Sequence, residues 1–487
     1  MFSLGIWLTS PDSRLLLKLS YQFNTDPYEQ IWQEIQLANP TAVMVCGFDN
    51  LLWQDFRKAI LCLYLKQYHP VIPSDQFAYR DKAMRLARHQ QGVDIQDLFQ
   101  LTKDAGCSDP RDRVFALLSL LGRGDKCPIQ PDYTKSVDDV YREVFVWEVE
   151  KTRLVDGLRN CELALEGLRT SNLPSWIPDL SIPRRSEELK LRPFDWSSLG
   201  NIPAMEDDIL NVRGVTVAKV KNVYNHTISS GLTTREIVLQ LHDIFDDAGF
   251  EMDAPFIGGG DFLQAYSRTV VANRFSETQI PENANYPSRV LTFETMRRAL
   301  NDRGPIQFNS ANSRADFERY IDTVLSAIIG RAVFSTEEGY IGIGPTNAQA
   351  GDCVTTLIGC RSPIILRPLE NGQWLVVGEA YCQGIMDGEP FLGPLPEGFE
   401  AMTNKTPANG FNYPIFLNHD TGDSLIEDPR LGELPSGWIR AHHPAEELFT
   451  LFDNFDTGAE MPPNWDPRTT PEALEERGTK LEDFELV

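Results

Sequence analysis

The sequence has far fewer basic than acidic residues, and this shortage disfavours two classes of partner. It contains 45 Lys and Arg against 70 Asp and Glu, so the formal net charge is −25. Nucleic-acid binding requires basic side chains that neutralise phosphates, and docking on anionic lipid requires them as well. The composition therefore predicts neither a nucleic-acid partner nor a membrane partner.

Long apolar runs and paired cysteine motifs are also missing. No segment reaches the length of about 18 apolar residues that spans a bilayer, and residues 1–20 lack the basic start of a secretion signal. The eight cysteines form no C-x-x-C pair, which disfavours a zinc ribbon or a thioredoxin-type site. Neither a P-loop nor a nucleophile elbow nor H-E-x-x-H occurs. We therefore expect a cytoplasmic protein with reduced thiols, no metal and no cofactor.

The chain is long enough for several globular domains. Its 487 residues are 42% hydrophobic and 24% charged, an ordinary soluble composition. The hydrophobic periods predict an α+β protein with helix-rich N-terminal and central parts. We divide it into residues 1–70, a helical region at 71–180, a mixed α/β variable region at 181–330, a small antiparallel β unit at 331–395, and a loop-rich region at 396–487.

In the first third, the pattern predicts helices and a single strand. Helices are expected after Asp26-Pro27, from Trp53, over 110–121 and after the capping residue Ser136. The strand is the β-branched run Thr41–Cys46. This part should therefore be mainly helical.

In the middle of the chain, the segment Ile209–Val223 alternates as two strands around Gly214 would. Helices are expected near 233–248, 285–302 and 311–329.

From Arg331 to Phe391 the hydrophobic period changes to two, which predicts an antiparallel β unit. Asn371-Gly372 is expected to form a two-residue type I′ turn that pairs Leu369 with Trp374. Residues 444–487 carry 3 Lys and Arg against 12 Asp and Glu, which predicts a solvated, weakly ordered acidic tail.

Three blocks of sequence carry a family resemblance. The first is DPYEQIWQEIQLANPTAVMVCGFDNLLWQDF (26–56), and the second combines SDPRDRVFALLSLL and PDYTKSVDDVYREV with LPSWIPD (108–179). The third extends from FSTEEGYIGIGP to GIMDGE (334–389). In this order the blocks resemble the heterokaryon-incompatibility (HET) proteins of fungi.

The resemblance implies that residues 1–70 are the remnant of a HET domain, whose fold is similar to the α/β fold of TIR domains. The family segments S-Y-x-W-G and W-I-D-x-x-C-I-N-Q are not present, so the N-terminal half of that domain is expected to be lacking. NAD cleavage is accordingly not expected.

Two functions remain open. The first is an interaction or regulatory component of non-self recognition, with protein partners, as the resemblance implies. The alternative is a HET-like enzyme of fungal secondary metabolism, a redox-cofactor-independent cyclase or isomerase acting on a polyketide-type intermediate. Its ligand would be an apolar small molecule.

Glu379 is the weak candidate for a catalytic acid, and the catalytic residues are otherwise unknown. The expected hairpin places it on the same face as Ile364 and Val377, in an apolar setting. A lone buried carboxylate is costly, so it must be paired, protonated or at the sheet rim. Arg367 points to the other face in this register. A structural ion pair with another element is favoured over a functional acid.

Other candidates are weighed against structural roles, and the structural role is favoured for each. Asp112 with Arg113 is typical of a helix start, and Glu34 beside Trp32 is expected on a solvated helix face. Trp176 is expected as a buried aromatic residue that packs between domains. The remaining candidates are the possible phosphate loop Gly339, Gly342 and Gly344, expected as turn glycines; the carboxylate pair in Asp387-Gly388-Glu389, expected as a hairpin turn; and His442-His443 with Glu446 and Glu447, expected to be solvent-exposed rather than metal-binding.

Overall fold

The computed structural model divides into two compact units. The N-terminal unit comprises Met1–Val144 and Leu180–Arg184, and the barrel unit comprises Phe145–Asp179 and Arg185–Val487. Among the helices that the structure describes, none is long and apolar enough to cross a membrane. The residues described are 4–10, 13–18, 43–46, 49–65, 95–102, 107–118, 121, 127–164, 172–182, 185–186, 189, 203–206, 208–226, 228–229, 231–405, 412–442, 450–458 and 466–487.

The N-terminal unit contains an antiparallel four-stranded sheet. Its strand order is β2-β1-β3-β4, with β1 Leu4–Ser10, β2 Ser13–Lys18, β3 Val43–Cys46 and β4 Asp49–Leu52. The expectation of a single strand was therefore wrong, although β3 confirms the strand predicted at 41–46. The helix expected after Asp26-Pro27 lies outside the described residues.

The helices of the N-terminal unit follow the predicted starts but not all the predicted lengths. The helix expected over 110–121 is only α5, because the chain turns after Phe115 and Leu117 N bonds Val114 O, three residues back. Ser136 caps α6 as predicted, since its Oγ accepts a hydrogen bond from Asp139 N at 3.1 Å. The helices are α2 Trp53–Leu65, α4 Ile95–Leu101, which was not predicted, α5 Asp112–Phe115 and α6 Val137–Thr152, whose part from Phe145 onward belongs to the barrel unit.

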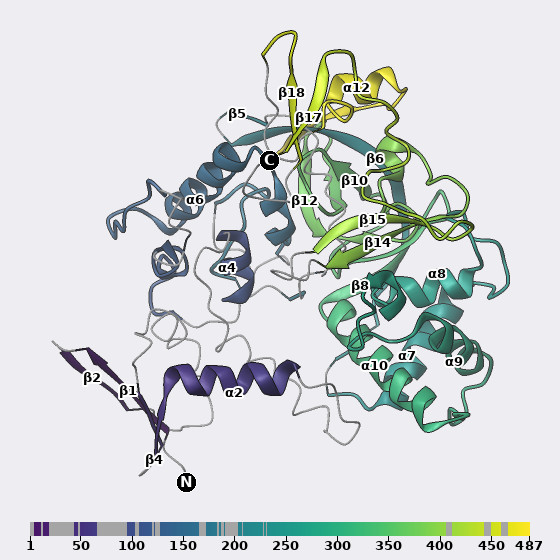
Figure 1. Cartoon of the computed structure of the whole chain (residues 1–487), viewed down its shortest axis with the longest axis horizontal. Coiled ribbons are helices and arrows are strands. Elements are labelled where there is room, and N and C mark those ends of the chain that lie inside the picture. The colour runs from purple at the N-terminus through teal and green to yellow at the C-terminus, as the bar shows by residue number, and fades with distance from the viewer. Residues whose placement is uncertain are drawn as a thin grey trace. The chain divides into compact units, whose positions relative to one another are not determined.

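A closed five-stranded barrel forms the centre of the barrel unit (Figure 1). Each strand pairs with the next in the order β6-β10-β11-β12-β19, and β19 pairs with β6 to complete the ring. All of these pairings are antiparallel except that of β12 with β19. The strands are β6 Ile209–Tyr224, β10 Cys353–Leu357, β11 Ile364–Pro368, β12 Trp374–Glu379 and β19 Glu482–Leu486.

Strand β6 is continuous, so the expectation of two strands around Gly214 was wrong. Gly214 pairs with Leu357 inside the sheet. A Cβ at this position would come within 2.4 Å of Thr356 O. Glycine is required here because two backbones approach closely, not because the chain turns.

The last part of β6 extends into a second group of strands, in the order β6-β8-β9-β13. Val333 and Ile343 pack with the helices, whereas Phe334 and Cys382 pack in a separate apolar cluster with Val354. This sheet therefore has an apolar cluster on each face. The strands are β8 Arg331–Thr336, β9 Ile341–Pro345 and β13 Tyr381–Cys382, and β5 Ala204–Glu206 pairs with β6.

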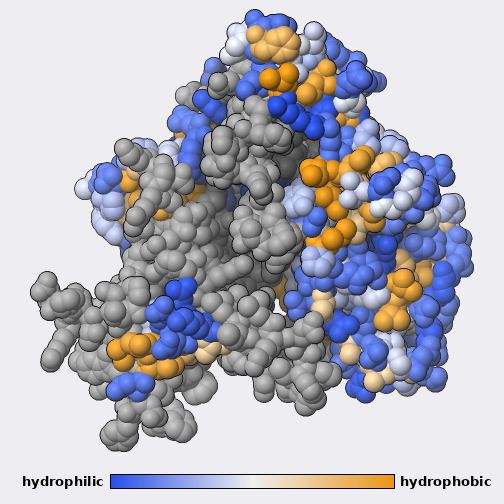
Figure 2. All heavy atoms as spheres, viewed as in Figure 1, coloured by the Kyte–Doolittle hydropathy of each residue, from blue (hydrophilic) through white to orange (hydrophobic). Residues whose placement is uncertain are grey.

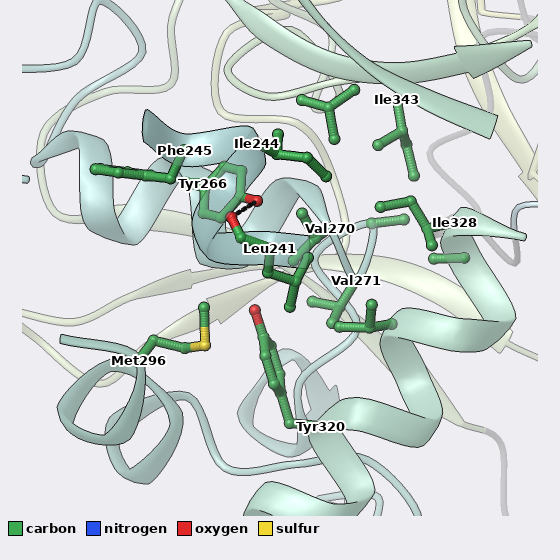
Figure 3. Packing of buried hydrophobic residues seen from close by; sticks show 14 of the residues in the cluster. Leu241, Ile244, Phe245, Tyr266, Val270, Val271, Met296, Tyr320, Ile328 and Ile343 are labelled. Atoms are coloured by element: carbon green, nitrogen blue, oxygen red, sulfur yellow. Dashed lines mark hydrogen bonds between the residues drawn. The ribbon is translucent and has the colours of Figure 1, made fainter. Parts of the chain in front are cut away.

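The helices gather in one layer beside this sheet (Figure 1). Their core contains Tyr266 and Tyr320, both fully buried, and the Tyr266 hydroxyl donates to Leu241 O at 2.7 Å (Figure 3). The three predicted helices are confirmed, and α8 was not predicted. The helices are α7 Thr234–Asp247, α8 Phe262–Thr269, α9 Arg289–Asn301 and α10 Ala311–Ile328, with the 3-10 turns η2 Asp156–Asn160 and η4 Ser276–Thr278.

The rest of the barrel unit consists of short elements from the C-terminal part of the chain. One sheet has the order β16-β15-β14-β7, and β17 pairs with β18 as a separate hairpin. The bounds are β7 Gln279–Ile280, β14 Phe399–Lys405, β15 Asn412–Asn418, β16 Ser424–Leu425, β17 Trp438–His442, β18 Thr450–Asn454, α11 Glu389–Leu392 and α12 Pro471–Glu476. The chain thus mixes helices and sheets, as the α+β expectation required.

The hairpin at Asn371-Gly372 forms, but its turn differs from the prediction. Leu369 N bonds Gln373 O, and only Gly372 takes a left-handed φ, at +86°. Pro368 rather than Leu369 therefore lies opposite Trp374. Three residues form the loop, and this matches a type I turn followed by a glycine bulge rather than a type I′ turn.

The acidic C-terminal segment is not a solvated tail over residues 466–487. Its last strand, β19, completes the barrel between β12 and β6. Phe484 and Leu486 are buried in this strand, whereas Asp483 and Glu485 are exposed. The alternation buries the apolar residues and leaves the carboxylates in solvent, which net charge alone did not reveal.

We predict that Phe484→Ala will lower the free energy of unfolding by about 3–5 kcal/mol, because the ring is buried against Trp374 with centroids 5.3 Å apart. Chemical denaturation followed by tryptophan fluorescence measures this loss. Asp483→Ala, at a side chain that is 85% exposed, is the control and should change stability little. Equal losses for the two variants would contradict the role of β19 as a barrel strand.

Candidate functional site

A cavity of about 530 Å³ opens where the helices meet the segments that follow β13 and precede β14. Pockets of this size hold small organic molecules. Its wall combines helix residues such as Arg268 and Arg289 with Asp387, Glu389 and Glu400 from the other side. We take this cavity as the candidate functional site.

Helix α8 presents two polar side chains to the cavity because its faces differ in polarity. Leu263 and Tyr266 are buried in the helical core, whereas Gln264 and Arg268, four residues apart, line the cavity. Asp261 caps the helix by accepting a hydrogen bond from Gln264 N at 2.8 Å. The guanidinium of Arg268 lies over the ring of Phe293, with 5.8 Å between Cζ and the ring centroid.

The turn after α8 has an unusual backbone. Ala272 and Asn273 both take left-handed φ angles, +49° and +54°. Such angles are costly for residues other than glycine and are often found at functional sites. Among the described residues, Asn273 Oδ1 is buried and lacks a hydrogen-bond partner, and Asn273 lines the cavity. An unsatisfied buried acceptor costs about 1–3 kcal/mol.

The pair Asp387 and Glu389 forms an acidic part of the wall. Gly388 has a φ of +95°, but the turn leads into α11 rather than between two strands, so the expected hairpin was wrong. Asp387 N donates to Glu389 Oε2 at 2.8 Å. Burial, reinforced by the charge of Asp387, raises the pKa of Glu389 to about 7, although Arg430 opposes the rise.

Arg430 holds this acidic turn in place. It forms two hydrogen bonds with the Asp428 carboxylate, and its remaining donors reach Asp387 O and Gly393 O, both at 2.6 Å. The guanidinium thus links the turn on both sides of α11 to the Asp428 segment. Bidentate pairs of this kind are among the strongest ion pairs in proteins.

The same Asp-Pro-Arg clamp occurs three times in the chain. In Asp466-Pro467-Arg468 the arginine again forms two bonds with the aspartate and donates to Gly432 O at 2.6 Å. In Asp109-Pro110-Arg111 of the N-terminal unit, the arginine reaches Tyr133 O at 2.5 Å. Sequence reasoning did not use this recurrence. The repeated Asp-Pro-Arg sequence is the signal from which the role of Arg430 could have been predicted.

A second ion-pair group forms another part of the wall. The Glu400 carboxylate lies 2.5 Å from Arg289 Nη1 and 2.9 Å from His419 Nε2. Glu277 accepts a hydrogen bond from the backbone N of Arg289 at the start of α9. The charge of Arg289 is therefore already balanced by Glu400. Sequence analysis identified neither Arg289 nor Glu400 as a candidate.

The arrangement places an acid with a pKa near neutrality beside a cationic side chain and apolar rings. Such a group can donate or accept a proton, or bind a cation, at physiological pH. Among the described residues, no group of three or more His, Cys, Asp or Glu has a geometry that could hold a metal ion.

Glu379, the weak catalytic candidate, lies away from this cavity in a buried ion network. Its Oε1 accepts from Arg159 Nε at 2.9 Å and Ser362 Oγ at 3.0 Å. Its Oε2 accepts from Arg331 Nη2 at 3.0 Å and Leu189 N at 3.2 Å. The side chain is fully buried. The expected structural pair with other elements is confirmed.

The glycines of the possible phosphate loop are strand residues, apart from Gly339 in a turn. Gly342 and Gly344 lie in β9, where the expectation of turn glycines was wrong. A Cβ on Gly342 would come within 2.3 Å of the Phe334 ring and 2.4 Å of Tyr381 O. Packing therefore accounts for Gly342, and a strand follows where a phosphate site needs a helix N-terminus.

The remaining candidates that the structure describes make contacts that fit a structural role. Asp112 accepts a hydrogen bond from the Tyr133 hydroxyl at 2.5 Å, and Arg113 donates to Thr102 O at 3.4 Å. Trp176 is buried against Phe145 and donates to Asp208 O at 2.8 Å. Trp32, Glu34, His443, Glu446, Glu447 and the side chain of His442 lie outside the described residues.

Comparison with known proteins finds a family model that matches part of the barrel unit. Residues 293–392 match the family model of the Het-6 β-barrel domain. That range contains β8–β13, whereas β6 and β19, which also belong to the barrel, lie outside it. No solved structure matches the chain.

The chain also has sequence similarity to an individual fungal protein. The chain is 24% identical over 340 residues to heterokaryon incompatibility protein 6, OR allele, of Neurospora crassa. The match covers 58% of this chain and 49% of that protein, so it spans about half of the relative's length. The resemblance to the fungal heterokaryon-incompatibility proteins is therefore confirmed.

We predict that Glu389→Gln will be more stable than the wild type at pH 8 but not at pH 4. The pKa of Glu389 is raised from 4.5 to about 7 on folding, so the folded protein retains a proton that the unfolded chain releases. Stability is consequently lost as pH rises through this window, and a residue that cannot ionise avoids the loss. The expected gain at pH 8 is roughly 1–3 kcal/mol.

Denaturant titrations at the two pH values measure the effect. Glu370→Gln, at an exposed position of the barrel unit, is the matched control and should show no gain at either pH. The same stability for Glu389→Gln and wild type at pH 8 would show that Glu389 is not held in a protonated state.

Proposed function

We propose that this protein is an interaction or regulatory component of fungal non-self recognition and that it does not cleave NAD. The observation that carries the proposal is the closed barrel, three of whose strands, β10, β11 and β12, lie in the segment that matches the Het-6 β-barrel domain. The relative named above takes its name from heterokaryon incompatibility. The comparisons do not favour a cyclase or isomerase of secondary metabolism.

A protein partner is supported by an apolar group near the β17–β18 hairpin. Four large apolar side chains there are exposed, by 40% to 75%: Leu425, Ile426, Ile439 and Phe455. The ion pair between Glu427 and Arg440 joins the Ile426 segment to the hairpin. Figure 2 shows apolar side chains at the top of the view, where Figure 1 places β17 and β18. Contiguous exposed apolar side chains are typical of protein interaction sites.

The proposal that NAD is not a substrate is supported by the environment of the glycines. Dinucleotide pyrophosphate binds where a glycine-rich loop leads into a helix N-terminus. The segment Gly339–Gly344 instead turns into strand β9, where packing fills the space beside Gly342.

The role in recognition is tested by co-expression in a fungal host. Expression of this protein alone should leave growth unchanged, whereas co-expression with the product of an incompatible allele should arrest it. The double variant Ile426→Asp, Phe455→Asp should restore growth, because a charge at each position disrupts an apolar interface. Leu51→Asp, at a side chain that is 45% exposed in the N-terminal unit, is the control and should still arrest growth.

Nicotinamide release from NAD tests the second half of the proposal, with an intact HET-domain protein as positive control. The purified protein should show no turnover above the background without enzyme. Turnover, or growth arrest by this protein alone, would contradict the proposed role.

A further inference from the structure

The β17–β18 hairpin has one face against the barrel unit and one face turned outward. Among the strands that the structure describes, β17 and β18 pair only with each other. Phe452 is buried on the inner face, where Arg440 lies over its ring and binds Glu427. Side chains alternate along a strand, so the neighbours of Phe452 and Arg440 point to the outer face.

Three side chains define the outer face of the hairpin. Ile439 lies directly opposite Asp453, and Phe455 follows on the same face, with its N–H bonded to Gly437 O. Ile439 and Phe455 are 47% and 67% exposed. Among the described residues, Asp453 has no ion-pair partner. The outer face therefore combines exposed apolar side chains with an uncompensated negative charge.

The outer edge of β18 has free backbone groups. In an antiparallel pair, alternate residues of each strand direct their N–H and C=O groups away from the partner strand. Among the described residues, the backbone of Phe452 and Asp453 bonds to no element other than β17. Such an edge can bind an additional strand, and a hairpin of two strands gains stability from a third.

The charge of the hairpin determines which kind of strand it accepts. Residues 438–456 contain a single Lys or Arg, Arg440, which Glu427 already pairs. The same stretch contains four acidic residues: Glu446, Glu447, Asp453 and Asp456. The whole chain has a formal net charge of −25, so a second copy would bring like charges together. A basic segment complements this charge.

We propose that the outer edge of β18 binds an extended basic segment of a partner protein as an additional strand. A Lys or Arg of that segment lies opposite Asp453, and a large apolar residue two positions away lies opposite Phe455. Side chains two residues apart share one face of a strand, so the partner carries basic and apolar residues with a period of two. This inference rests on the proposed recognition role, for which it specifies the partner.

Peptide binding to the full chain, followed by fluorescence anisotropy at physiological ionic strength, tests this surface. The probe is the labelled peptide Thr-Lys-Thr-Ile-Thr-Lys-Thr-Ile-Thr, whose spacing fits the edge in either direction. Control peptides replace both Lys by Glu or both Ile by Ser. Each control should bind at least about tenfold more weakly, since each lacks one complementary contact. Equal binding of the three peptides, or no binding of the probe at millimolar concentration, would overturn the proposal.

Backbone methylation of the probe tests whether it binds as a strand. One peptide carries N-methyl groups on its Lys and Ile amides, and the other carries them on its Thr amides. Only one of these two sets of amides faces β18, so one peptide should lose binding and the other should keep it. Equal binding of the two methylated peptides, or loss of binding by both, would exclude strand addition.

A charge exchange then assigns the contact to Asp453. Asp453→Lys should reverse the preference, so that the Glu peptide binds more tightly than the Lys peptide. Glu370→Lys, at an exposed position elsewhere in the barrel unit, changes the net charge equally and should keep the wild-type preference. An unchanged preference in Asp453→Lys would place the peptide elsewhere and refute the proposal.

Sedimentation of the protein without peptide distinguishes a second copy from a basic partner. The wild type should remain monomeric over the concentration range of the binding assay. Dimerisation that Phe455→Ser abolishes would show that a second copy occupies the edge, and it would overturn the proposal.

The peptide experiments and the fungal co-expression test fail independently. Absence of peptide binding refutes strand addition, whereas growth arrest that depends on Ile426 and Phe455 would still support the recognition role. Peptide binding with the expected specificity, in a protein that causes no arrest on co-expression, would support the strand site and refute the recognition role alone.

Discussion

The buried carboxylate of Glu379 is the constraint on which the barrel unit depends. It is fully buried at the end of β12, where an unpaired charge would cost several kcal/mol. It is satisfied only because Arg159, Arg331, Leu189 N and Ser362 Oγ all come within 3.2 Å. These groups come from four separate segments, so the charge is tolerated only when the whole unit is assembled. The network therefore favours one arrangement of segments over other compact states.

Strand β6 extends this arrangement from the barrel to the helices. It pairs with β19 and β10 in the barrel and then with β8. In β8, Val333 packs with the helices and Phe334 with the other apolar cluster, so a single strand supports both cores. Arg331, at the start of the same strand, is a partner of Glu379. The cavity lies where this framework ends, and its acidic turn is held by Arg430 rather than by the sheet.

Local sequence patterns predicted many of the helices and strands, but they could not predict which distant strands pair. The helices α7, α9 and α10 and the alternation after Arg331 follow from residues within one segment. The barrel does not, because Leu210 pairs with Leu486 across nearly the whole unit and no local period encodes such a partner. The need for a partner of Glu379 was predictable from its apolar face, but Arg159 lies 220 residues away in the sequence. Of the residues that line the cavity, the sequence singled out only Asp387 and Glu389 as candidates. The other lining residues come from elements that are distant in the sequence.

A double-mutant cycle between Arg331 and Glu379 tests the central claim most directly. Denaturant unfolding would be measured for the wild type, Arg331→Met, Glu379→Leu and the double variant. Arg331→Met removes one of the two arginines that bind Glu379, and Glu379→Leu removes the carboxylate that binds the buried Arg331, so each should lose about 3–5 kcal/mol of stability. The double variant should lose less than the sum of the two by at least about 2 kcal/mol, because neither charge then remains. Additive losses would contradict the claim that this ion network holds the barrel unit together.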